Sequence, residues 1–130
     1  MTDDHIVLTI PGEGGFEQIA HLVLGGVGAR SNLTYESLDD LEVAVESLLE
    51  RIDNAGEVTV SLRVDDDSIH AAVGPFTTGA LRRELERDGG EEMGLRRVLQ
   101  TVVDGFGVGE REDGDWVEVT KHVSGGGRAA

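Results

Sequence analysis

Residues 33–52, LTYESLDDLEVAVESLLERI, carry the strongest periodic pattern of the chain. Their apolar side chains recur at spacings of three and four, which places on one helical stripe Leu38, Leu41, Val45, Leu48, Leu49 and Ile52. Thr34 suits the cap of the first turn, and the sequence Asn-Ala-Gly at residues 54–56 suits a stop. The pattern predicts a helix with one buried face and one acidic, solvated face. Ser47 and Arg51 lie at the boundary between these faces.

Strand and helix patterns surround this central helix. Before it, we expect a strand at residues 5–10, a helix at 16–29 and a linker at 30–33; after it, strands at 57–64 and 69–73, a helix at 77–87, a loop at 88–92, a helix at 94–103 and strands at 106–111 and 116–123. The two hairpins predict an α+β fold, a two-layer α/β sandwich with a mixed, mainly antiparallel sheet and helices on one face. We expect one domain over residues 1–123 and a disordered tail at 124–130.

The composition limits the classes of function. The chain has 130 residues, no Cys and a formal net charge of −15. Such a surface repels phosphate backbones and anionic lipids, so we expect neither nucleic-acid binding nor membrane binding. The acidic N-terminus does not match a signal peptide, and no apolar run reaches the ~20 residues of a membrane span. A cytoplasmic protein is the expectation, and its acidity fits either plain solubility in a salt-rich cytoplasm or attraction to a basic partner.

Three local motifs offer little chemistry of their own. The Gly-rich loop at residues 11–15 lacks a following Lys-Ser/Thr, so we interpret it as a flexible connection rather than a phosphate loop. The acids at residues 65–67 point different ways in a tight turn, which favours solvation over cation binding. The four His residues are scattered without metal-ligand spacing, so we predict no metal site and no nucleophilic triad.

Three longer phrases carry a resemblance to a known family. They are LTYESLDDLEVAVESLL at residues 33–49, VTVSLRVDDDSIHAAVGPF at 58–76 and MGLRRVLQTVVDGFGVGEREDGDWVEVTKHV at 93–123. The chain resembles the anti-sigma-factor serine-protein kinases, small bacterial regulators with the histidine-kinase-like (GHKL) ATPase fold. The resemblance runs from Ile6 to Val123. It implies that fold, ATP and Mg²⁺ as cofactors, and a sigma factor or an anti-sigma antagonist as protein partner, with a homodimer possible.

On the central helix, the family uses a Glu as base in phosphoryl transfer and an Asn one turn later to hold Mg²⁺. The resemblance sets the Glu position at Ser47 and the Asn position at Arg51. Arg51 has no side-chain acceptor with which to bind a metal. A register shifted by one residue sets Glu46 at the base position and Glu50 at the Asn position, which restores a carboxylate but turns it away from the edge of the apolar stripe.

Elsewhere, the family uses an Asp two residues before a Gly to bind adenine, and a Gly-x-Gly at the end of its lid. The resemblance sets the adenine position at Ala72, which offers no hydrogen bond, followed by Gly74. The lid motif becomes Gly94-Leu95-Arg96, in which Arg96 replaces the second glycine. This pattern implies an ATP site that has lost its adenine acceptor and its metal ligand.

Three hypotheses about function follow. The leading one is a regulatory protein-binding domain that resembles anti-sigma factors and lacks ATPase and kinase activity. The alternative is an active serine-protein kinase that uses ATP, with Glu46 as base, and phosphorylates an antagonist protein. The third is a sensor of a small anion, held directly by Arg51 and Arg96 in place of a metal.

Overall fold

The computed structural model describes residues 4–11, 25–26, 35–51, 56–65, 68–86 and 94–122. Its elements, in chain order, are β1 (Asp4–Pro11), α2 (Tyr35–Leu49), β2 (Glu57–Val64), β3 (Ser68–Phe76), α3 (Ala80–Glu86), α4 (Leu95–Val102), β4 (Gly105–Arg111) and β5 (Gly114–His122). Of the helix predicted at 16–29, only residues 25 and 26 are described, and both are helical. The tail predicted at 124–130 lies outside the described residues.

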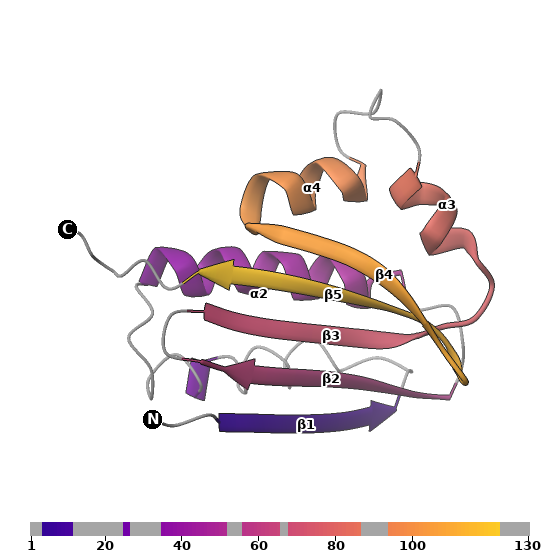
Figure 1. The fold of residues 1–130 in the computed structure, drawn as a ribbon, viewed down its shortest axis with the longest axis horizontal. Helices are drawn as coiled ribbons and strands as arrows, with labels where there is room; N and C mark the ends of the chain where they lie inside the picture. The colour runs from indigo at the N-terminus through magenta and orange to yellow at the C-terminus, as the bar shows by residue number, and fades with distance from the viewer. Residues whose placement is uncertain are drawn as a thin grey trace.

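The strands form one five-stranded sheet in the order β1-β2-β3-β5-β4. Every neighbouring pair is antiparallel, so the described sheet has none of the parallel pairing that a mixed sheet would contain. Figure 1 shows α2 running along the strands, with α3 and α4 beside the β4 edge. The predicted α+β class, with helices packed on an antiparallel sheet, is confirmed.

The core forms between α2 and one face of the sheet. Alternate residues of β2 are buried, and the register aligns Val60 with Val73 of β3, and Val73 with Val117 of β5. The central helix contributes its stripe of fully buried side chains Leu41, Ala44, Val45, Leu48 and Leu49. Full burial of one such Val or Leu side chain stabilises the fold by about 1.5–3 kcal/mol. Four residues of the predicted stripe are thus confirmed as core; Leu38 is partly buried, and Ile52 lies outside the described residues.

The central helix ends in a turn whose last amide bonds to the third preceding residue instead of the fourth. Glu50 N donates to Glu46 O at 3.0 Å, and Arg51 N donates to Leu48 O, three residues back, also at 3.0 Å. A bond to the third preceding residue tightens the last turn. This turn carries Arg51 on the same side of the helix as Ser47, four residues earlier.

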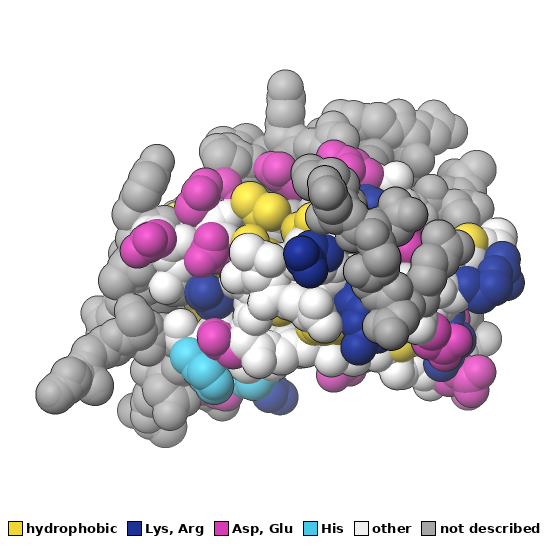
Figure 2. All heavy atoms as spheres, turned by 90° about the horizontal axis from the view of Figure 1, so that it is seen from above, with side chains coloured by type: hydrophobic (Ala, Val, Ile, Leu, Met, Phe, Trp, Pro, Cys, Tyr) yellow, Lys and Arg dark blue, Asp and Glu magenta, His cyan; other side chains and the backbone are white. Residues whose placement is uncertain are grey.

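The outer surface is strongly acidic in places. Figure 2 views the molecule from above in relation to Figure 1, and acidic side chains gather along the upper side of this view and at its lower right. Glu36 and Asp39, in the first part of α2, are among the exposed acids. The solvated face predicted for the central helix is confirmed in part, since Asp39 and Glu50 are exposed. The other acids of that face are half-buried: Asp40, Glu42 and Glu46.

Candidate functional site: an ion pair between three helices

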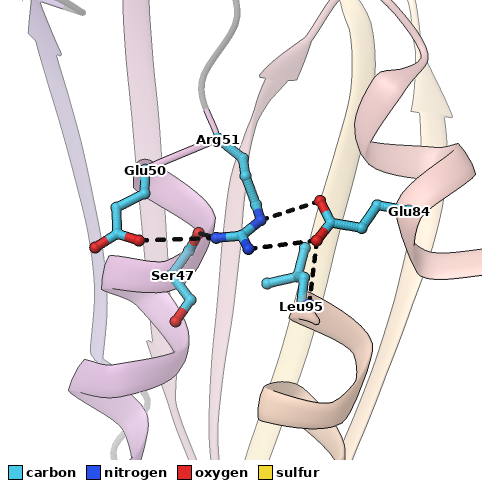
Figure 3. Close-up of polar contacts among 5 residues, drawn as sticks. All are labelled: Ser47, Glu50, Arg51, Glu84 and Leu95. Atoms are coloured by element: carbon cyan, nitrogen blue, oxygen red, sulfur yellow. Dashed lines mark hydrogen bonds and ion pairs between the residues drawn. The ribbon is translucent and has the colours of Figure 1, made fainter. Parts of the chain in front are cut away.

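Arg51, in the turn that ends α2, binds Glu84 of α3, and Glu84 also contacts the first residue of α4 (Figure 3). Its Nε donates to Glu84 Oε1 at 3.1 Å and its Nη2 donates to Glu84 Oε2 at 3.3 Å. Its Nη1 donates to the carbonyl oxygen of Ser47 at 3.0 Å. Two parallel bonds from one guanidinium to one carboxylate fix both the distance and the orientation of the pair.

The same carboxylate also reaches the beginning of α4. Leu95 N donates to Glu84 Oε2 at 3.2 Å. Gly94 precedes this helix as its N-cap and has no side chain with which to cap it. Glu84 therefore supplies, from another helix, the acceptor and the negative charge that a helix N-terminus favours. We call Arg51, Glu84, Ser47 O and Leu95 N together the Arg51–Glu84 clamp.

A second bond between α3 and α4 lies beside the clamp. Arg96 Nη1 donates to Leu85 O at 2.7 Å, so it satisfies a carbonyl in the last turn of α3. The two connections run in opposite directions: a carboxylate of α3 accepts from the α4 backbone, and a guanidinium of α4 donates to the α3 backbone. Together they fix how the two short helices meet.

The other side of α3 is attached to the sheet. Arg82 donates through Nη2 to Asp115 Oδ1 at 3.0 Å and through Nε to Asp115 Oδ2 at 3.2 Å. The hydrogen bonds that Arg82 donates to Asp115 raise the pKa of its guanidinium above the ordinary value. Leu81 and Leu85 are the buried residues of α3. This helix of 7 residues is thus positioned by two apolar contacts and two bidentate ion pairs.

Four of the residues singled out by the resemblance lie in the clamp or beside it. Arg51 and the carbonyl of Ser47 belong to the clamp. Gly94 is the N-cap of α4, whose first amide binds Glu84, and Arg96 donates to Leu85 O beside the clamp. Glu50 contacts its edge, since Arg51 Nη1 lies 3.7 Å from Glu50 Oε1.

Glu46, the carboxylate considered as base, precedes Ser47 by one residue. It is therefore rotated by about 100° around the helix.

The two positions assigned to adenine recognition lie elsewhere. Ala72 pairs with Ser61 and Glu118 and lines a depression on the opposite face of the sheet, whereas the buried Val73 faces α2. Gly74 is buried against the ring of Trp116, where an added Cβ would lie 2.6 Å from the ring atom Cδ2. Ala72 therefore lies on the face of the sheet opposite to α2, and Gly74 packs against Trp116.

Sequence reasoning did not find Glu84 as a site residue. It lies 33 residues from Arg51, so no local spacing connects the two. The available signal was its place beside the buried Leu85, at the boundary of the apolar stripe of a short helix. An acidic residue there and a basic residue at the boundary of the central helix form a complementary pair only once both helices are placed.

The groups of the clamp do not fit a magnesium–nucleotide complex. Magnesium requires oxygen ligands, and a guanidinium at Arg51 has no acceptor to offer. The nearby carboxylate of Glu84 is engaged by Arg51 and Leu95 N. Across the described ranges, no three His, Asp or Glu side chains gather as a metal-binding group. Nor does any helix in those ranges have the length and apolarity to cross a membrane.

The face of the sheet opposite to α2 has a polar depression of about 330 Å³. Its side chains bond to one another across strands: His5 Nε2 lies 2.9 Å from Ser61 Oγ, and His70 Nδ1 lies 3.2 Å from Thr120 Oγ1. His70 Nε2 also lies 3.0 Å from Asp65 Oδ2. These cross-strand contacts stabilise the sheet on the face that the described helices leave open.

No protein-family model matches the chain. The chain is 28% identical over 145 residues to the serine-protein kinase RsbW of Bacillus velezensis, an alignment that covers 94% of this chain and 88% of that protein. It is 26% identical to the serine-protein kinase RsbW of Bacillus subtilis, with 94% and 88% covered, and 26% identical to that of Listeria innocua, with 93% and 88% covered. Over nearly its whole length, the chain is thus a distant relative of the RsbW serine-protein kinases.

Proposed function

We propose that this chain is a regulatory domain that acts by binding a protein partner and does not transfer phosphate. The observation that carries the proposal is the Arg51–Glu84 clamp. On the side of α2 to which the family resemblance assigns the base and the metal ligand, this chain has a serine and an arginine, and the arginine is bound to a carboxylate of α3 at 3.1 and 3.3 Å.

A nucleotide bound at this site would lack two polar partners. A buried polar partner left unmade costs about 1–3 kcal/mol. Two missing partners, one for the metal and one for the adenine amine, would weaken binding by roughly 30-fold to more than 10⁴-fold. Any bound phosphate would also have to displace Glu84 from Arg51 and Leu95 N. These terms all oppose nucleotide binding, which supports a function without ATP or Mg²⁺.

The proposed partner follows from the family resemblance and from charge. By that resemblance it is a sigma factor or an anti-sigma antagonist in the cytoplasm, and the domain itself can form a homodimer. A net charge of −15 favours a partner with a basic contact surface. Affinity purification of the tagged chain from its native host should recover one protein in stoichiometric amount. Recovery of none would count against the proposal.

The relatedness to proteins named as serine-protein kinases favours one alternative, an active kinase with Glu46 as base. The test is transfer of label from ATP to the recovered partner, with Bacillus subtilis RsbW and its own substrate as a positive control. The proposal expects no transfer. Transfer that is abolished in the Glu46→Gln variant would establish the kinase instead.

A further inference from the structure

Two donors from different helices converge on one oxygen in the clamp. Arg51 Nη2 and Leu95 N lie 3.3 and 3.2 Å from the same Glu84 Oε2 (Figure 3). A guanidinium and the first amide of a helix of 8 residues both favour a negative charge. The arrangement is that of an anion site, and its occupant is a side chain of the protein itself.

We infer that Glu84 is a built-in anion, which holds α2, α3 and α4 in one arrangement without a bound ligand. Without its carboxylate, the space between Arg51 and Leu95 N becomes a site for a tetrahedral oxyanion such as inorganic phosphate. This inference rests on the proposed function in one respect: it requires that no phosphate of ATP normally occupies the space between Arg51 and Leu95 N.

The surroundings allow the site to persist when the Glu84 side chain is shortened. The Arg82–Asp115 ion pair and the Arg96–Leu85 bond hold α3 from two sides without using Glu84. Ser47 O keeps Nη1 of Arg51 in place at 3.0 Å. The side chains of Arg51 and Glu84 are 28% and 30% exposed, so a small anion can enter from solvent.

The first experiment is rescue of the Glu84→Ala variant by inorganic phosphate. We expect its melting temperature to rise saturably with phosphate, by about 4–8 °C at ten times the dissociation constant, with ionic strength held constant by KCl. The wild type, the Glu86→Ala variant in the same helix and the Arg51→Met/Glu84→Ala double variant should not respond. Absence of a rise in Glu84→Ala, or an equal rise in all four proteins, would overturn the inference.

The second experiment asks whether the sign of the charge at the α4 N-terminus matters. The Arg51→Glu/Glu84→Arg double variant keeps an ion pair but places a cation beside Leu95 N. We expect this variant to be less stable than the wild type, with an equilibrium constant of unfolding at least tenfold larger. Stability equal to that of the wild type would overturn the inference.

The Glu84→Gln variant keeps the size of the side chain and removes only its charge, so it serves as a test that does not create a cavity. We expect its equilibrium constant of unfolding to be at least tenfold larger than that of the Glu86→Gln variant. Equal constants for the two variants would contradict a built-in anion. Titration of the wild type with Mg-ATP reports separately on the proposed function, because phosphate rescue of Glu84→Ala does not depend on its outcome.

Discussion

Gly74 lies against the indole ring of Trp116, and this contact explains why a residue without a side chain stands at position 74. A Cβ at this position would lie 2.6 Å from Cδ2 and 2.8 Å from Cγ of Trp116. The ring cannot move away freely, because its Nε1 donates to Asp113 Oδ1 at 2.8 Å and the Arg111 guanidinium lies 4.2 Å from its centroid. A glycine that the family resemblance assigned to nucleotide binding is thus required here by packing.

At the residue scale we therefore predict that Gly74→Ala destabilises the protein by about 1–3 kcal/mol, the usual cost of overpacking. The measurement is urea denaturation followed by Trp116 fluorescence. Gly107→Ala is the matched control, since nothing lies within 4 Å of its added Cβ, and it should stay within about 0.5 kcal/mol of the wild type. Equal destabilisation by both substitutions would show that the contact with Trp116 is not the cause.

At the scale of the elements, Lys121 joins α2 and α4 to the sheet. Its Nζ donates to Asp40 Oδ2 at 3.1 Å and to Val102 O at 3.0 Å, and its side chain is only 15% exposed. Lys121→Met should cost about 1–3 kcal/mol, because it leaves a carboxylate and a carbonyl without this donor. Thermal denaturation compares it with Arg97→Met, an exposed residue on α4, which should be near neutral. A loss no larger than that of the control would mean that the contact contributes little.

The pattern of the sequence predicts the elements well and their mutual placement poorly. The helix predicted at 94–103 is α4, and the strands predicted at 57–64 and 69–73 are β2 and the middle of β3, because short-range periodicity determines both. The Arg51–Glu84 contact joins residues 33 apart, and only the packing of α2 against α3 and α4 creates it. The face of Ala72 follows from the two-residue alternation of β3, in which Ile69, Ala71 and Val73 point to the core.

At the scale of the whole molecule, the net charge of −15 opposes the compact state. Salt screens this repulsion, because the screening length falls from roughly 21 Å at about 0.02 M KCl to roughly 6 Å at about 0.3 M. The melting temperature should therefore rise across this range, even though the exposed ion pairs weaken. The salt is KCl, because sulfate stabilises proteins by exclusion from their surface. A steady fall in the melting temperature would show that the ion pairs dominate over the net charge.

In the function that we propose for the whole molecule, a side chain of the protein, Glu84, holds the helices together and no nucleotide complex is required. Isothermal titration of the wild-type chain with Mg-ATP tests it most directly, with Bacillus subtilis RsbW titrated in parallel as a control. The account predicts no saturable heat up to millimolar nucleotide. Binding with a micromolar dissociation constant would contradict it.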